Sequence, residues 1–309
     1  MKISVAMITY NHEAYIEQAV ESVMQQTGDF ELELIIGEDN SKDNTRALVQ
    51  RLANQYPDKI KLLLWSPNIG MMPNFVKTLD ACTGQYVAIL EGDDYWTDPL
   101  KLQKQLDYMQ AHPACAMCYH NANVLIIETG QTHPANTHTQ QVGGLKDLIL
   151  ATDFAQMMTG SMFYRNTYFN ALPSWLVKQH AGDRALPIIL ATYGEIHYNP
   201  AIMSVYRKHQ GGISVIKQAN YFKKGNLNLL NTLKKELPAA MRPFIKQRRS
   251  DVYLQWAIDY RRYYKAFFTP LRYFILSLWY NMSFTRQQFK SIIADDLFYN
   301  LHKRLKNKR

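Results

Sequence analysis

The first third of the chain alternates between short apolar runs and stretches with helical spacing, and this alternation restricts the fold more than any other feature. The apolar runs lie near residues 3–9, 32–37, 60–65 and 86–91, about 27 residues apart, which is typical of βαβ units. Right-handed crossovers place such strands in one parallel sheet, with the loops at their carboxyl ends on a common rim. The sequence therefore predicts an α/β protein whose functional groups lie on that rim.

Further strand patterns follow near residues 116–127, 160–164 and 196–206. The polar stretch 131–144, rich in Thr, Gln, Asn and His, is expected to form a long mobile loop. Beyond residue 207 the spacing of apolar residues becomes helical and stays so to the end of the chain.

The charge of the chain is divided unevenly between these parts. Residues 1–214 hold 15 Lys and Arg against 21 Asp and Glu, whereas residues 215–309 hold 20 against five. This asymmetry predicts a domain over 1–214 that can hold a cation. It also predicts a basic, aromatic-rich helical region over 215–309 that can meet an anionic surface.

The amino terminus does not resemble a signal peptide, and the best candidate for a transmembrane span, residues 266–282, is short and interrupted by Pro270 and Arg272. Three cysteines suit a reducing compartment. Cys115 and Cys118 are spaced like a redox pair, but they lie in an apolar run and are predicted to be structural. We expect a cytoplasmic protein that its basic region can bring to the inner face of the cell membrane.

Three carboxylates crowd the end of the fourth apolar run, at Glu91, Asp93 and Asp94. In extended backbone Glu91 and Asp93 point to one side, and Gly92 between them adds no bulk. Such a cluster repels itself unless protons or a cation compensate, and hard oxygen ligands suit Mg²⁺ or Mn²⁺. For these residues alone, a solvated acidic turn is the alternative interpretation.

Four motifs, in this order along the chain, resemble those of the family 2 glycosyltransferases, which are inverting enzymes with a GT-A fold. They are Val5–Asn11 with Glu21–Thr27, Ile35–Thr45, Gly84–Trp96, and Gly182–Arg184 with Met203–Gly212. Together they cover about residues 3–215, and the resemblance is to enzymes of bacterial surface-polysaccharide synthesis. It implies a GT-A-like α/β fold with a mixed, mainly parallel sheet, a nucleotide-binding half over 1–98 and an acceptor half over 99–214.

The resemblance gives Glu91-Gly92-Asp93 the role of the family's D-x-D signature, although Glu stands in place of the first Asp. It makes Asp93 the direct ligand of Mn²⁺ or Mg²⁺, and Glu91 either a second ligand or a contact to the ribose or a metal-bound water. Asp94, on the substrate side, either ligates the ion through water or caps the turn. His209 either completes the metal or diphosphate contacts or is an ordinary hydrogen-bonded histidine.

Asp39 resembles the carboxylate that accepts a hydrogen bond from the base of the nucleotide. An aspartate there selects a ring N–H, as N3 of uracil or thymine provides, and a UDP-sugar is the favoured donor. The alternative role of Asp39 is to cap the next helix. Thr9, Tyr10, Asn11 and Glu13 would line the same pocket, where Tyr10 could stack on the base.

Asp183 resembles the family's general base, which takes the proton of the acceptor hydroxyl and typically contributes ~10²–10⁴-fold to the rate. Its alternative role is that of a helix N-cap. Trp96, Ser161 and Arg165 are expected at the acceptor site, with Trp96 offering an aromatic face to a sugar or packing in the core.

These residues predict a metal-dependent inverting glycosyltransferase that moves a sugar from a nucleotide-diphosphate sugar to a glycan or lipid-linked glycan, in cell-surface polysaccharide or lipopolysaccharide synthesis. A sugar-phosphate nucleotidyltransferase is the first alternative, and it would need a glycine-rich phosphate loop that the first strand lacks. A non-enzymatic nucleic-acid or membrane-binding protein is the second. Nucleic acid is not expected as a partner, because an acidic rim without a metal repels phosphates. Residues 215–309 are expected to contact an anionic membrane or to cap the catalytic domain.

Overall fold

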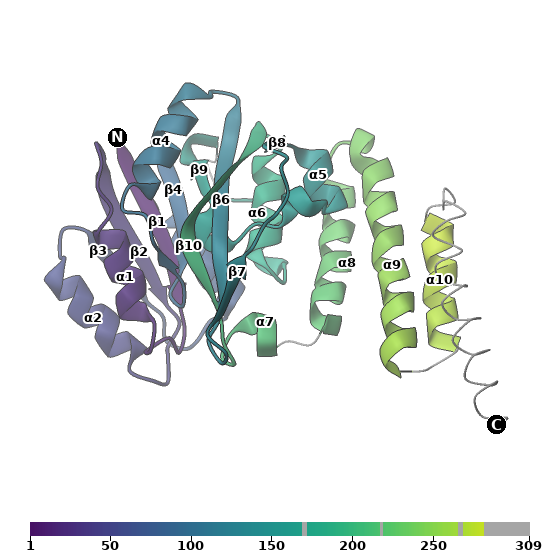
Figure 1. The fold of residues 1–309 in the computed structure, drawn as a ribbon, viewed down its shortest axis with the longest axis horizontal. Helices are drawn as coiled ribbons and strands as arrows, with labels where there is room; N and C mark the ends of the chain where they lie inside the picture. Colours follow the sequence, from purple (N-terminus) through teal and green to yellow (C-terminus); the bar gives the residue numbers. More distant parts are fainter. Residues whose placement is uncertain (169–171, 217–218, 265–267, 281–309) are drawn as a thin grey trace. The chain divides into compact units, whose positions relative to one another are not determined.

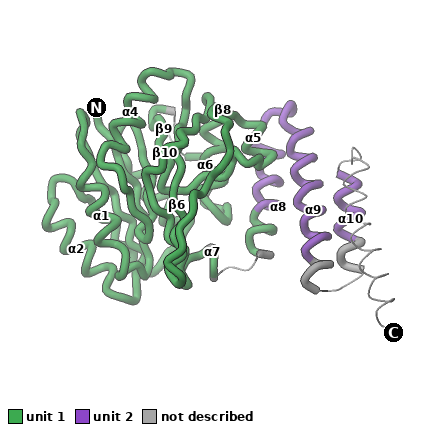
Figure 2. Tube along the Cα trace, viewed as in Figure 1, with its two compact units in different colours: residues 1–225 green, residues 226–309 purple. Residues whose placement is uncertain are grey.

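The computed structural model describes residues 1–168, 172–216, 219–264 and 268–280. The chain forms two compact units, Met1–Gly225 and Asn226–Arg309, which are described separately below (Figure 2). The division falls inside the helix Ala219–Glu236, a little beyond the 214/215 boundary suggested by the charge.

Unit 1 is built on one mixed sheet with the order β3-β2-β1-β4-β9-β6-β10-β5 (Figure 1). Its strands are β1 (Lys2–Thr9), β2 (Glu31–Glu38), β3 (Ile60–Leu64), β4 (Tyr86–Glu91), β5 (Tyr95–Trp96), β6 (Cys115–Ile126), β7 (Gln131–Pro134), β8 (Val142–Gly143), β9 (Phe163–Arg165) and β10 (Glu195–Lys208). Strands β3, β2, β1 and β4 are parallel to one another, as are β6 and β10, whereas β9 runs antiparallel between β4 and β6. The α/β fold with a mixed, mainly parallel sheet is therefore confirmed.

The helices of the described chain connect and follow these strands. They are α1 (Ile16–Met24), α2 (Thr45–Gln55), α3 (Met71–Asp80), α4 (Lys101–Ala111), α5 (Leu145–Leu150), α6 (Gly182–Leu190), α7 (Ile213–Ile216), α8 (Ala219–Glu236), α9 (Arg242–Tyr264) and α10 (Phe268–Tyr280). Short 3-10 turns, among them Thr159–Ser161, join the later strands.

The parallel register aligns the ends of the first strands. Thr9 of β1 pairs with Glu38 of β2, and Ile8 pairs with Glu91 of β4. Because these are the last residues of β2 and β4, the loops that follow all emerge on one rim of the sheet, as the spacing of apolar runs predicts.

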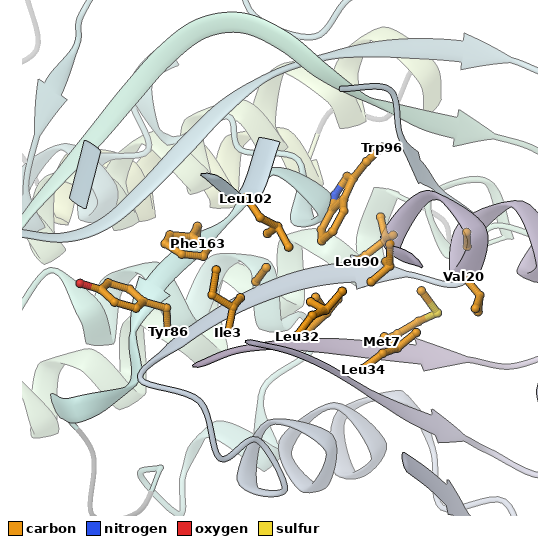
Figure 3. Close-up of a cluster of buried hydrophobic side chains, with 14 of the residues drawn as sticks. Ile3, Met7, Val20, Leu32, Leu34, Tyr86, Leu90, Trp96, Leu102 and Phe163 are labelled. Carbon is orange, nitrogen blue, oxygen red and sulfur yellow. The ribbon is translucent and has the colours of Figure 1, made fainter. Parts of the chain in front are cut away.

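A continuous apolar core fixes this sheet against its helices (Figure 3). Met7, Leu34 and Leu90 point to one face of the sheet, where Val20 of α1 and Leu102 of α4 pack against them. Each such side chain contributes up to about 1.5–3 kcal/mol when fully buried. Alternate residues point to the other face, where α3 contacts β1 and β2.

Two local predictions need correction. The stretch 131–144 is not a continuous loop, because β7 pairs with β6 and β8 pairs with β10. Its polar side chains gave no strand pattern, since backbone groups make those pairs while the β7 side chains stay exposed. The run 160–164 begins as a 3-10 turn and becomes strand only at Phe163. Cys115 and Cys118, predicted to be structural, are free thiols buried in β6.

Within unit 2, α9 and α10 pack against each other in antiparallel fashion. Arg249 donates a hydrogen bond to the Tyr280 hydroxyl at 3.3 Å, and Trp256, farther along α9, contacts Tyr273 near the start of α10. Among the described residues of the whole chain, no helix combines the length and apolar character that crossing a membrane requires.

Candidate active site

The carboxyl ends of β1, β2 and β4 are tied together at the rim. Asp39 donates its backbone N–H to the Thr9 carbonyl at 3.1 Å, and Gly92 donates to the Ile8 carbonyl at 3.0 Å. A Cβ at Gly92 would lie 2.7 Å from Thr9 Oγ1, so the close approach of these loops requires glycine there.

The acidic turn that follows β4 gathers three carboxylates. One oxygen each from Glu91, Asp93 and Asp94 lies within 4.8 Å of the others. Burial, followed by the charges of Asp93 and Asp183, raises the pKa of Glu91 to about 8. Burial, followed by Asp93 and Glu91, also raises the pKa of Asp94 well above its usual value. The cluster is thus a set of carboxylates, with Asp94 buried and Glu91 and Asp93 half-buried, that repel one another when they are ionised.

Two imidazoles face the central carboxylate of this turn. Nε2 of His209 lies 3.1 Å from Oδ2 of Asp93, and Nε2 of His12 lies 3.6 Å from the same oxygen. Burial opposes ionisation of Asp93, but the two histidines outweigh it and lower the pKa of Asp93. Thr9 Oγ1 lies 3.2 Å from Nδ1 of His12 and orients its ring. The sequence interpretation included His209 but missed His12, a lone histidine without ligand spacing.

Arg207 fixes the acidic turn to β10. Its backbone N–H donates to Asp94 Oδ1 at 2.8 Å, and Nη1 donates to the Asp93 carbonyl at 2.8 Å. The guanidinium lies 5.1 Å from the ring centre of Tyr15 and 4.3 Å from that of Tyr95. Asp94 is therefore buried, with one carboxylate oxygen engaged in holding two strands together. Nothing in the sequence pattern gave Arg207 this role.

The residues present fit a divalent cation. Three carboxylates at this spacing offer hard oxygen ligands, and a cation would relieve the repulsion that raises the pKa values of Glu91 and Asp94. Imidazole nitrogens beside Asp93 add donors that suit Mn²⁺ better than Mg²⁺.

Asp39 lies in the loop after β2 and binds the loop after β3. Oδ1 accepts the backbone N–H of Ile69 at 2.7 Å and Oδ2 accepts that of Gly70 at 2.9 Å. Burial, partly offset by these bonds, raises the pKa of Asp39. Asp39 does not cap the next helix, α2, where Asp43 accepts the Thr45 N–H instead. Each carboxylate oxygen has a second lone pair, so Asp39 can still accept a hydrogen bond from a ligand.

The other residues predicted at the nucleotide pocket divide by role. Asn11, with a positive φ of 57°, accepts the Lys42 N–H at 2.8 Å, and Glu13 accepts the Asn44 N–H at 2.9 Å. These two side chains join the first loop to the second. Tyr10, by contrast, is exposed on the rim.

Asp183 stands in the first turn of α6, one residue after Gly182, whose Cβ would collide with the Phe75 ring. The N-cap is Ala181, so Asp183 does not have the predicted alternative role of capping residue. Oδ1 of Asp183 is buried and has no hydrogen-bond partner among the described residues. Burial raises the pKa of Asp183 against the lowering effect of Arg184, and its charge reaches Glu91.

Trp96 and Ser161, predicted on the acceptor side, are buried structural residues. Trp96 donates Nε1–H to the Gly160 carbonyl at 2.7 Å, and Nζ of Lys101 lies 3.8 Å from the centre of its ring. Ser161 donates its hydroxyl to the Met158 carbonyl at 2.6 Å. Neither side chain presents a free surface to a sugar.

Arg165 is not brought to the rim at all. It donates to the Tyr86 hydroxyl at 2.8 Å and to the Cys115 carbonyl at 3.1 Å. Because Tyr86 begins β4 and Glu91 ends it, Arg165 lies at the opposite end of the sheet from the acidic turn. The side chain that does reach Glu91 is Thr159, through a hydrogen bond that lowers its pKa.

Comparison with known proteins identifies the family of the chain. The family model described as glycosyl transferase family 2 matches residues 4–167, more than half of the chain. An uncharacterized protein of Mycobacterium tuberculosis, Rv1520, is 35% identical over 212 residues, which are 68% of this chain and 60% of the relative. The chain thus spans less than two thirds of that relative's length.

A second relative is the GalNAc(5)-diNAcBac-PP-undecaprenol beta-1,3-glucosyltransferase of Campylobacter jejuni, 38% identical over 96 residues, or 30% of each chain. Among solved structures, the mannosyltransferase PcManGT of Pyrobaculum calidifontis, in complex with GDP-Man and Mn²⁺, matches with a TM-score of 0.60 at 14% identity, over 99% of this chain and 82% of that one. From the family match and this GT-A-like fold we conclude that the chain belongs to glycosyl transferase family 2, a family of glycosyltransferase enzymes.

Proposed function

We propose that the protein is a metal-dependent, inverting glycosyltransferase that moves a sugar from a nucleotide-diphosphate sugar to a glycan or lipid-linked glycan of a cell-surface polysaccharide. The observation that carries this proposal is that the charge of Asp183, whose Oδ1 is buried without a partner among the described residues, acts on Glu91 of the carboxylate cluster. The proposed base and the candidate cation-binding residues then belong to one active site, which suits sugar transfer with a diphosphate as the leaving group.

The residues divide the reaction between them. When bound, Mn²⁺ or Mg²⁺ supplies Lewis-acid stabilisation to the leaving diphosphate, and Asp93, with Glu91 and His209, would hold it. Asp183 takes the proton of the acceptor hydroxyl as the oxygen bonds to the anomeric carbon and the bond to the diphosphate breaks. Its raised pKa makes it a stronger base than an exposed aspartate.

A UDP-sugar is the favoured donor on the evidence of Asp39. Both of its oxygens already accept backbone N–H groups, so the carboxylate is fixed in orientation and offers only acceptor positions to a ligand. A carboxylate that is held rigidly selects a base with a ring N–H, as uracil or thymine has at N3. Tyr10, exposed on the same rim, is available to stack on that base.

The proposed acceptor class rests on similarity to a relative and on the positions of the residues around the site. The relative from Campylobacter jejuni is named for its action on GalNAc(5)-diNAcBac-PP-undecaprenol, and this supports a lipid-linked glycan as the acceptor class. Because Trp96, Ser161 and Arg165 serve structural roles, we assign the acceptor side to the surroundings of Asp183 instead.

A donor screen tests the proposed function. The purified protein is incubated with UDP-, GDP- and dTDP-sugars, in Mn²⁺ or in EDTA, and release of the nucleoside diphosphate is measured. We expect release from a UDP-sugar in Mn²⁺ and none in EDTA. Equal release in EDTA would contradict the requirement for a metal. Absence of both binding and release with every donor would contradict the proposed function.

A further inference from the structure

Helix α10 of unit 2 exposes a narrow face that carries two apolar side chains and one cation. Arg272, Ile275 and Trp279 recur at intervals of three and four residues and therefore share one narrow face of the helix. Ile275 is 56% exposed, and Trp279, at 71%, is the most exposed large hydrophobic side chain among the described residues. We call these three residues the α10 stripe.

The opposite face of α10 explains why the stripe points outward. Tyr273 packs its ring 4.8 Å from that of Trp256 on α9, and Ser250 donates a hydrogen bond to the Ser277 carbonyl at 2.9 Å. These contacts fix the rotation of α10 on α9. Tyr253 and Trp256 of α9 thus pack against aromatic residues of α10, whereas Trp279 of α10 is exposed.

The charge of this unit identifies the kind of partner. Residues 226–309 hold 17 Lys and Arg against five Asp and Glu. The exposed cations of the described part include Lys234, Lys235, Arg242, Lys246 and Arg272. A partner that suits both an exposed Trp and Ile and an excess of cations has an apolar layer beneath a layer of negative charge.

We propose that the α10 stripe inserts into the headgroup boundary of an anionic lipid bilayer, with α10 lying along the membrane plane. Tryptophan favours this boundary because its ring is largely apolar and carries one polar N–H. Among the described residues no helix has the length and apolar character needed to cross the hydrocarbon layer, so we assign the apolar side of α10 to the interface. Cations alone would also suit RNA or an acidic protein, but they would leave Ile275 and Trp279 without a role.

Vesicle co-sedimentation of the full chain tests this surface without any sugar nucleotide, so its result is independent of the proposed enzymatic function. We expect binding to vesicles of phosphatidylcholine with phosphatidylglycerol and little binding to phosphatidylcholine alone. Replacing both Ile275→Ser and Trp279→Ser should weaken binding roughly tenfold or more. Arg272→Gln should weaken it about fivefold.

Matched controls separate the stripe from general apolar exposure. Ile202 and Tyr193 of unit 1 are exposed to a comparable degree, at 41% and 49%, and Ile202→Ser with Tyr193→Ser should leave binding unchanged. Circular dichroism checks that helix content is retained. Equal loss in both double variants would overturn the proposal, as would undiminished binding of the stripe variant.

Two further readouts exclude other occupants. Quenching by brominated lipid should report Trp279 directly, and the variant Trp279→Phe should bind yet lose that quenching. Light scattering of the wild type should give the same mass as the stripe variant. A larger wild-type mass would mean that a second copy covers the stripe, and unquenched Trp279 in bound protein would mean that charge alone holds the vesicle; either result contradicts insertion.

Discussion

At the scale of single residues, the site depends on side chains held in unfavourable surroundings. Asp183 keeps a buried carboxylate oxygen without a partner in the described chain, and Asp93 is ionised between two imidazoles. Buried polar atoms normally have hydrogen-bond partners, because leaving one of them without a partner costs ~1–3 kcal/mol. Such a cost at Asp183 is consistent with a group that meets its partner only when an acceptor is bound.

Removing the charge of Asp183 tests its assignment as base. Asp183→Asn should retain donor binding but lower the rate of transfer by ~10²–10⁴-fold, since the amide cannot take the acceptor proton. Isothermal titration with the donor and single-turnover transfer measure the two effects. Asp107→Asn, an exposed aspartate on α4, is the control. An unchanged transfer rate in Asp183→Asn would mean that another residue is the base.

His12 is expected to set the affinity for the cation by orienting Asp93. His12→Asn should weaken Mn²⁺ binding by about 10–100-fold, the range typical of residues that support a metal ligand. Titration of Mn²⁺ followed by paramagnetic resonance, with the nucleoside diphosphate present, gives the affinity. The exposed His133 of β7 provides the control His133→Asn. Wild-type affinity in His12→Asn would show that the 3.6 Å approach to Asp93 has no consequence.

At the scale of elements, β10 brings distant motifs into one site. Its later residues pair with β5, at Ser204 with Trp96 and Val205 with Tyr95, directly beyond the acidic turn. Arg207 then bonds to Asp93 and Asp94, and His209 follows the end of the strand. A long strand thus converts a separation of more than a hundred residues in sequence into a hydrogen bond between His209 and Asp93.

Lys101, at the start of α4, is expected to destabilise the folded protein. Its Nζ is fully buried over the Trp96 ring, has no hydrogen-bond partner among described residues, and has a pKa lowered to about 7 by burial. The unfolded chain binds more protons than the folded one between about pH 7 and 10.5, so stability rises with pH across that window. Below pH 7 both states are protonated, and the full cost of the buried charge remains.

Lys101→Met should therefore stabilise the protein at pH 7 and below by a few kcal/mol, at about 1.4 kcal/mol for each unit of pKa shift. The gain should shrink as the pH approaches 10.5. Chemical denaturation at several pH values measures it, with the exposed Lys104→Met as the control. A variant as stable as the wild type at every pH would contradict a net cost of burying the Lys101 amine without a hydrogen-bond partner in the described chain.

The elements that could be predicted from sequence are those whose side chains are buried on both faces. Strands β1, β2 and β4 show apolar runs for this reason, and their shared rim followed from parallel pairing. Strands β7 and β8 could not be predicted, because backbone bonds and not apolar side chains define them.

Predictability within the site follows a similar rule. Asp39, Asp93 and Asp183 stand beside strand ends or a helix start, where motif and topology agree on their place. Arg165 was misplaced, because closeness in the chain does not say at which end of an antiparallel strand a residue lies. His12 was missed, because only the fold brings it to Asp93.

At the scale of the whole molecule, the chain consists of two units with different chemistry. The acidic residues of the candidate site lie in Met1–Gly225, and the excess of cations lies in Asn226–Arg309. A nucleotide that binds only the first unit stabilises that unit by mass action, at ~2.7 kcal/mol when the ligand is at 100 times its Kd.

Calorimetry can test whether the two units unfold separately. We expect two heat-absorption transitions for the full chain, of which UDP with Mn²⁺ raises the temperature of one only, since the candidate nucleotide site lies wholly in the first unit. Adenosine diphosphate with Mn²⁺ is the matched ligand control. A single transition that UDP shifts as a whole would contradict the independence of the units.

We propose that Asp93 holds the cation on which sugar transfer depends, and a comparison of three proteins tests this role. Release of nucleoside diphosphate from the preferred sugar donor in Mn²⁺ is measured for the wild type, for Asp93→Asn, and for Asp29→Asn, an exposed aspartate outside the site. We expect a fall of at least about 100-fold in Asp93→Asn alone, because a catalytic cation contributes several kcal/mol. Turnover by Asp93→Asn at the wild-type rate would contradict it.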